Sequence, residues 1–196
     1  MNSFKLFALA STVSAGGSIN VSVNGQDRQM HMVGSGSTDG QTAYTLPHNS
    51  GVKLMTTDHM DPNGFYRPGL LGGSIEYDIG LSQVDCRCNS AFYMVSAPAK
   101  NEDGSFNPSS GGDYYCDANN VGGAWCPEMD IQEANKYAFR MTPHRCDAPN
   151  SKGHYYNCDR AGCGKSIYEA AGRNAYGPGD QYRINTNNWF HVKIDF

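Results

Sequence analysis

Alternation of apolar and polar residues predicts short strands along most of the chain. Residues 18–23 (SINVSV) alternate with a period of two, which is typical of a half-buried strand, and Asn24-Gly25 predicts a hairpin turn after them. Residues 29–33 (QMHMV) alternate again. Runs bounded by Gly, Pro, Asn and Asp predict further strands at residues 42–46, 51–56, 73–81, 91–96, 125–133 and 190–196.

Short strands with turn signals throughout, and no long amphipathic helix, predict an all-β fold of the β-sandwich type. The best helix candidate, Ser166–Gly172, has about two turns. Two long loops are expected, residues 98–114 and 147–179, and loops of such length in a compact domain are usually functional. The final residues, FHVKIDF, alternate cleanly up to the last position, which predicts a sandwich that is incomplete at the C-terminus.

The first 15 residues have the pattern of a secretory signal peptide. Lys5 precedes an apolar run, and Val13-Ser14-Ala15 supplies the small residues of a cleavage site. We therefore expect a signal peptide at residues 1–15, one domain at residues 16–196, and a secreted, extracellular protein. The alternative is a buried N-terminal strand or helix. No later run approaches the roughly 18 apolar residues of a membrane span, so no membrane association is expected.

Cysteine content and net charge narrow the expected partners. Seven cysteines in an exported chain favour disulfides, and their spacing matches no zinc pattern, so we expect neither a metal nor a cofactor. The net charge of -4, without a cluster of Lys and Arg, argues against nucleic acid as a partner. A monomer is expected.

The segment CPEMDIQEAN places Glu128, Asp130 and Glu133 on one predicted strand. Glu128 and Asp130 share a face, but the odd offset of Glu133 puts it on the other face unless a β-bulge near Ile131 or Gln132 intervenes. With the bulge, two glutamates can act as the carboxyl pair of a retaining glycosidase, which stands about 5 to 5.5 Å apart. The alternative on spacing alone is a solvated acidic face.

This segment resembles the active-site strand of glycoside hydrolase family 7, the cellobiohydrolases and endoglucanases that cleave β-1,4-glucan. The resemblance covers roughly residues 70–196 and extends to seven segments in the family's order. They are GSIEYDIGLSQVDC, NSAFYMVS, YYCDAN, EMDIQEAN, TPHRC, CDRAGCG and YGPG. It implies a concanavalin-like jelly roll and a β-glucan polysaccharide as substrate.

Catalytic roles are implied by the resemblance residue by residue. Glu128 matches the nucleophile, Asp130 its supporting acid and Glu133 the acid and base. His144 matches a histidine beside the acid and base on the leaving-group side. The alternative to this role is that His144 is an ordinary loop histidine.

The resemblance also implies glucan contacts and disulfides. Asn89 and Tyr93 match residues beside the cut bond, with a turn cap and a core tyrosine as their alternatives. Tyr115 and Asp117 match further glucan contacts. The family pairing joins Cys116 to Cys126 and Cys158 to Cys163.

Departures from the family pattern favour an endo-acting enzyme with an open cleft. Family members are about twice as long, and their tryptophan between the second and third acids is Gln132 here. Two other functions stay open. One is an endo-β-1,3-glucanase of the related family 16, and the other is a non-catalytic glycan-binding or wall-associated protein.

Overall fold

The computed structural model describes residues 3–6 and 16–196, which form two compact units. The first unit comprises residues up to Gly80 together with Trp189–Phe196, and the second comprises Leu81–Asn188. Within the described ranges, no helix has the length and apolar character that crossing a membrane requires.

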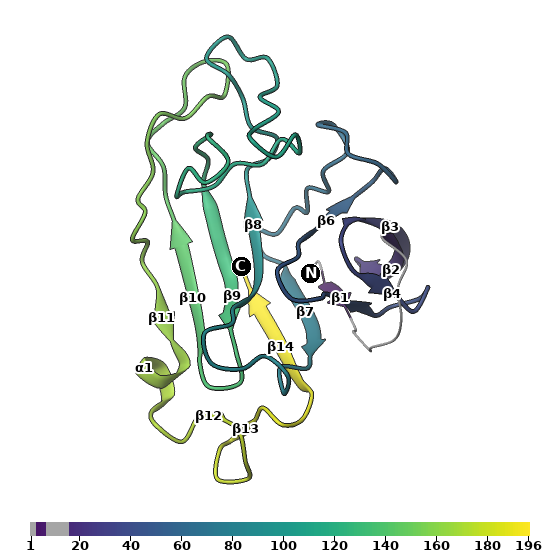
Figure 1. Ribbon diagram of the computed structural model, residues 1–196, viewed down its shortest axis with the longest axis vertical. Helices are drawn as coiled ribbons and strands as arrows, with labels where there is room; N and C mark the ends of the chain where they lie inside the picture. Colours follow the sequence, from purple (N-terminus) through teal and green to yellow (C-terminus); the bar gives the residue numbers. More distant parts are fainter. Residues whose placement is uncertain (1–2, 7–15) are drawn as a thin grey trace. The chain divides into compact units, whose positions relative to one another are not determined.

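The first unit consists of three small sheets (Figure 1). One has the order β1-β7-β14, one has the order β2-β3-β6, and β4 pairs with β5. The strands are β1 (Ser3–Leu6), β2 (Gly17–Val23), β3 (Gln26–Gly34), β4 (Ser37–Thr38), β5 (Tyr44–Thr45), β6 (Val52–Met55), β7 (Ser74–Ile79) and β14 (Phe190–Asp195).

The hairpin between β2 and β3 forms as its sequence predicts. Asn24 and Gly25 both have positive φ, at 56° and 75°, as a type I′ turn requires. Ile19 and Val21 on β2 are fully buried, while exposed Asn20 stands between them, so the period of two corresponds to one buried face.

The second unit is built on one four-stranded sheet with the order β11-β10-β9-β8. Long loops extend from one end of this sheet, and a short helix and a two-stranded β12-β13 sheet lie at the other end (Figure 1). The elements are β8 (Ser90–Val95), β9 (Glu128–Ala134), β10 (Phe139–His144), β11 (Lys165–Ser166), α1 (Ile167–Ala171), β12 (Tyr176–Gly177) and β13 (Ile184–Asn185).

Helix α1 begins and ends where its sequence predicts. Ser166 is the N-cap, and Glu169 completes a capping box by accepting hydrogen bonds from the backbone and hydroxyl of Ser166. Gly172 ends the helix with φ 86°, a conformation that favours glycine. The predicted all-β fold, with one short helix in the described residues, is confirmed.

Strand β10 is the main element that the sequence pattern did not predict. Pro143 lies inside it, and a proline lacks the N–H that a central strand needs. The proline is tolerated because β11 pairs only with Arg140 and Met141, so β10 is an edge strand at Pro143. The last strand, β14, pairs with β7 and lies at the edge of the described sheet.

Residues 3–6 form β1, which pairs with β7 in parallel. Residues 7–15, which complete the predicted signal peptide, lie outside the described residues. The signal peptide therefore stays a prediction.

Candidate active site

The predicted β-bulge is present in β9, between Asp130 and Glu133. Against β8, Tyr93 lies opposite Asp130 and Phe92 lies opposite Gln132, so Ile131 is the extra residue. The register against β10 shifts at the same point. Ile131 and Gln132 are both fully buried, so two consecutive side chains point into the core. The bulge thereby returns Glu133 to the face that Glu128 and Asp130 share.

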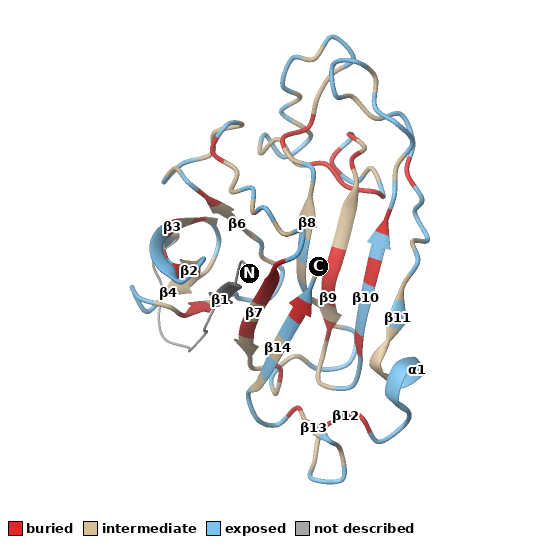
Figure 2. Cartoon of the chain, turned by 180° about the vertical axis from the view of Figure 1, so that it is seen from behind, coloured by how far each residue is buried: buried red, intermediate tan, exposed pale blue. Residues whose placement is uncertain are grey.

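The neighbouring strands present side chains to this same face. On β10, His144 lies opposite Glu128, Thr142 opposite Asp130 and Arg140 opposite Glu133. On β8, Tyr93 and Ala91 lie opposite Asp130 and Glu133. Because directly opposed residues share a face, the acids of β9 are flanked on both sides. Figure 2 shows that buried and exposed positions both occur along β10, where Thr142 and His144 are buried.

These side chains line a cavity of about 410 Å³ within the second unit. Its lining contains three carboxyl groups, two guanidinium groups and one imidazole. The lining residues are Ala91, Tyr93, Asn119, Glu128, Asp130, Glu133, Arg140, Thr142, His144, Arg160 and Ala161. A cavity that gathers this many ionisable groups is a candidate catalytic site.

Asp130 and His144 form a buried pair that holds a proton. Nε2 of His144 lies 3.1 Å from Oδ2 of Asp130, and both side chains are at most 10% exposed. Nδ1 lies 2.8 Å from the carbonyl oxygen of Asp159, and because a carbonyl only accepts, Nδ1 carries a hydrogen. A neutral imidazole would then have a lone pair at Nε2. The contact with Asp130 thus needs one further proton, on either partner.

The pKa values of Glu128, Asp130 and His144 are all raised. Burial raises the pKa of Glu128 and of Asp130, and the charge of nearby Glu133 raises that of Asp130 further. Burial by itself lowers the pKa of His144. The hydrogen bond to Asp159 and the charges of Asp130 and Glu128 outweigh burial, so the pKa of His144 is raised.

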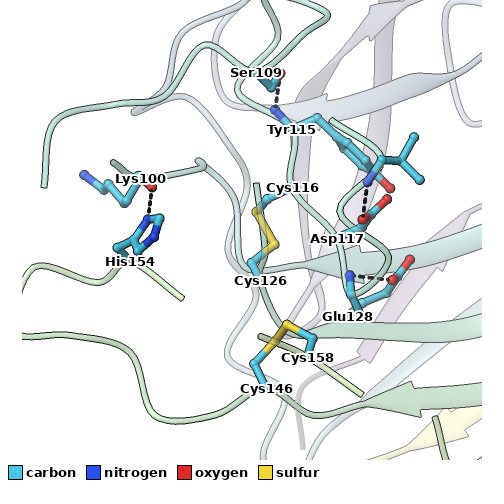
Figure 3. The surroundings of a disulfide bond; sticks show 12 residues. Lys100, Ser109, Tyr115, Cys116, Asp117, Cys126, Glu128, Cys146, His154 and Cys158 are labelled. Carbon is cyan, nitrogen blue, oxygen red and sulfur yellow. Dashed lines mark hydrogen bonds between the residues drawn. A yellow bond between two sulfur atoms is a disulfide. The ribbon is translucent and has the colours of Figure 1, made fainter. Parts of the chain in front are cut away.

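Glu128 is held by the loop that precedes β9. The backbone N–H of Ala118 donates to its Oε2 at 3.0 Å. The Cys116–Cys126 disulfide anchors this loop, and Figure 3 shows the bond beside Tyr115, Asp117 and Glu128. Both half-cystines are almost fully buried. The side chain is therefore oriented by a cross-linked piece of backbone.

Glu133 is held differently, by a side chain from the start of β8. Nδ2 of Asn89 donates to Oε1 of Glu133 at 3.2 Å. Two glutamates on one strand therefore have separate hydrogen-bond partners. Glu128 accepts from a backbone N–H, whereas Glu133 accepts from a neutral side-chain amide. Distinct surroundings are how paired carboxyl groups acquire distinct roles.

The remaining predicted glucan contacts lie at different depths. Tyr93 lines the cavity, and its ring meets that of Tyr115 edge to face at 6.4 Å. Burial raises the pKa of both hydroxyl groups. Asp117 is buried, and its Oδ1 accepts from the backbone N–H groups of Asn119 and Val121, so it shapes the loop from behind the cavity lining. Glucan contact by Tyr115 and Asp117 stays a prediction.

One disulfide follows the family pairing and the other does not. Cys116 is joined to Cys126, as the resemblance implied. The predicted Cys158–Cys163 bond is wrong in this structure, where Cys158 is joined to Cys146. Cys146 and Cys158 face each other across an antiparallel bridge, whereas the backbone of Cys163 bonds Pro143 and its side chain is exposed. Cys86 and Cys88 are also free thiols.

Sequence reasoning missed four polar residues of the cavity: Asn119, Arg140, Thr142 and Arg160. Arg140 and Thr142 belong to the strand that was not predicted, and Asn119 and Arg160 to loops. The Thr142 hydroxyl is buried without a hydrogen-bond partner in the described part of the chain. Alternation with His144 at positions 140, 142 and 144 is the signal that could have indicated Arg140 and Thr142.

A sheet that presents two glutamates and an intervening aspartate inside a polar cavity is the arrangement of glycoside hydrolases that act through paired carboxyl groups. Comparisons with known proteins agree. The sequence model of Glycosyl hydrolase family 7 matches residues 117–196.

Curated relatives include Endoglucanase 1 of Humicola insolens, 32% identical over 154 residues, with 65% of this chain and 37% of the relative covered. Endoglucanase EG-1 of Hypocrea jecorina is 30% identical over 182 residues, with 83% of this chain and 37% of the relative covered. The chain is thus similar to glycosyl hydrolase family 7 over residues 117–196, and it spans about a third of the length of these relatives.

Solved structures confirm the β-sandwich fold. An endoglucanase I complexed with cellobiose has a TM-score of 0.64 at 18% identity, with 97% of this chain and 68% of that chain covered. A family 7 cellobiohydrolase from Daphnia pulex has a TM-score of 0.57 at 16% identity, with 97% of this chain and 67% of that chain covered.

Proposed function

We propose that the chain is catalytic sequence of a secreted, endo-acting β-1,4-glucanase that retains anomeric configuration. The observation that carries the proposal is the bulge of β9, which sets Glu128, Asp130 and Glu133 on one face of one cavity. Relatives that are named endoglucanases support the reaction class, and a solved relative bound to cellobiose supports a β-glucan substrate. The family match favours this function over a family 16 β-1,3-glucanase.

In the first step, a carboxylate oxygen of Glu128 attacks the anomeric carbon. The bond from this carbon to the glycosidic oxygen breaks, and Glu133 gives its proton to the departing oxygen. The N–H of Ala118 fixes one oxygen of Glu128, which orients the carboxylate for attack. Asn89 orients the carboxyl group of Glu133. The product is a covalent glycosyl ester and a free sugar hydroxyl.

In the second step, water attacks the same carbon and gives a proton to Glu133, while the ester bond to Glu128 breaks. Two inversions at one carbon give net retention. Asp130 lies on the same face as the nucleophile, and the proton that it shares with His144 lets this acid remain buried beside two glutamates. The pair therefore keeps negative charge from accumulating behind the nucleophile.

The test is release of reducing sugar from barley β-glucan, carboxymethylcellulose and laminarin by the 196-residue chain. We expect activity on the β-1,4-containing substrates, a faster fall in viscosity than in an exo-acting control, and the β-anomer as first product by NMR. Glu128→Gln should reduce activity to that of the enzyme-free control. Glu102→Gln, an exposed glutamate outside the cavity, is the matched control and should change nothing.

Inversion of configuration would refute Glu128 as nucleophile. Binding of glucan without hydrolysis by a folded wild-type chain would instead indicate a glycan-binding protein.

A further inference from the structure

Two arginines stand at opposite ends of the row of acids. Arg140 lies across from Glu133 in the sheet. Arg160 follows Asp159, whose carbonyl holds His144, the residue opposite Glu128. Both arginines line the cavity. A neutral glucan chain has no group that needs a full positive charge to bind it. The presence of two arginines in the cavity lining therefore needs another explanation.

Arg160 is presented to the cavity by close packing of its loop on β10. Gly162 has φ 64°, and a Cβ there would lie 2.5 Å from the side chain of Thr142 and 2.7 Å from the ring of His144. The loop backbone thus rests directly on these two residues. The path leaves Arg160 and Ala161 at the cavity wall.

The guanidinium of Arg160 is held in place by an aromatic ring and not by an acid. Its Cζ lies 5.0 Å from the ring centre of Trp125, a cation–π contact. Within the described residues, no carboxylate lies within ion-pair distance of Arg160. A guanidinium held over an aromatic ring presents paired donors that match a carboxylate or sulfate.

Arg140 has a different position. Its Nη1 lies 3.4 Å from Oε2 of Glu169, so part of its charge is already offset. The two arginines therefore differ: Arg140, at the Glu133 end, is paired with Glu169, whereas Arg160, at the Glu128 end, has no ion pair within the described residues.

We propose that Arg160 binds an acidic substituent on the sugar chain, so that the site prefers β-glucans bearing carboxylate or sulfate groups over neutral ones. This specificity rests on the proposed glucanase function. The guanidinium would donate two parallel hydrogen bonds to the anion, and Trp125 would keep the guanidinium planar and oriented. The three acids lie on β9, whereas Arg160 stands on a loop, so the anion binds beside the acids and not among them.

The test measures binding by calorimetry in the Glu128→Gln background, which prevents hydrolysis. The ligands are cellotetraose, the same tetrasaccharide oxidised at C6 to glucuronosyl units, and its sulfate ester. We expect the acidic ligands to bind about fivefold more tightly than cellotetraose, as for a partly exposed ion pair. Arg160→Gln should weaken binding of the acidic ligands more than binding of cellotetraose, so that the two affinities become equal. Arg160→Lys should retain part of it.

Arg145→Gln is the matched control, because Arg145 is exposed on the same segment and does not line the cavity. It should keep the preference. In 1 M salt the Debye length is about 3 Å, so the ratio of the affinities for acidic and neutral ligands should fall toward one. A stronger response to sulfate than to carboxylate, or the reverse, identifies the natural substituent.

Equal binding of neutral and acidic ligands, or equal loss of both in Arg160→Gln, would overturn the proposal and leave the glucanase function standing. Failure to bind any of the three ligands, together with no hydrolysis by the wild-type chain, would overturn both.

Discussion

Replacing Asp130 by Asn tests the shared proton between Asp130 and His144. The substitution keeps the size of the side chain but removes its charge. The new amide can still donate to Nε2 of a neutral imidazole, because Nδ1 already donates to Asp159. A charge-assisted hydrogen bond is therefore exchanged for a neutral one, and no buried group is left without a partner.

The expected loss is the difference between these two hydrogen bonds. A hydrogen bond to a charged group contributes about 1.5–3 kcal/mol and a neutral one about 0.5–1.5 kcal/mol. Since the two side chains are only 6% and 10% exposed, water screens little of the difference. We expect Asp130→Asn to lower the free energy of unfolding by about 1–2 kcal/mol near pH 6, or roughly 2–8 °C in Tm for a chain of this length. His144→Ala, which leaves a buried carboxylate alone, should cost about 3 kcal/mol or more.

The pH dependence of this difference has a definite sign. The pKa of His144 is raised in the folded state, so its contribution is full below the unfolded value of about 6.5 and is lost as pH rises through the folded pKa. The pKa of Asp130 is also raised, so its stabilising contribution is full below its unfolded value of about 3.9 and is lost as pH rises through its higher folded pKa. Both effects reduce the difference in free energy of unfolding between the wild type and Asp130→Asn as pH rises.

The assay is thermal unfolding of the wild type and Asp130→Asn at intervals from pH 5 to pH 8.5, with NMR titration of the His144 ring. The advantage of the wild type should shrink with pH, and the pKa of His144 should fall in the variant. An advantage that stays constant or grows with pH would refute the shared proton.

Three further predictions concern the supports of the site. Replacing both Cys116 and Cys126 by Ser should lower the free energy of unfolding by about 3 kcal/mol, from the loop-closure entropy of a separation of 10 residues, as urea unfolding would measure. Gly162→Ala should cost about 2–4 kcal/mol through its positive φ and its clash with His144, and it should lower kcat in the hydrolysis assay. Gln132→Ala should cost about 3 kcal/mol in urea unfolding, because a fully buried side chain and its 3.0 Å hydrogen bond to β8 are lost; a cost under 1 kcal/mol would mean that the core does not depend on it.

The acidic row could be predicted because three facts of the sequence agree. The charges stand on one predicted strand, their odd spacing demands a bulge, and a bulge places them where paired carboxyl chemistry needs them. The structure has this bulge between Asp130 and Glu133. The hairpin at Asn24-Gly25 and the capped helix after Ser166 were predictable for a similar reason, since each depends on residues that are adjacent in sequence.

The rest of the site depends on pairing between distant segments. His144 was expected only from its family motif, because Pro143 disguised the strand that carries it. Arg160 reaches the cavity through the path of a loop, and no periodicity reports such a path. The second disulfide was wrongly predicted because it was taken from the family pairing, whereas in this fold an antiparallel bridge brings Cys146 and Cys158 face to face.

The extra residue in β9 also bears on how the site tolerates insertions and deletions. Removing Ile131 would make the spacing from Asp130 to Glu133 even, so an unbulged strand would still present every acid to the cavity. The bulge is therefore not the sole geometry that can unite these acids, but it is the one that their present spacing requires. The extra residue adds a second buried side chain, so that Ile131 and Gln132 both pack into the core between Asp130 and Glu133. A one-residue deletion there would keep the three acids on one face and weaken the core.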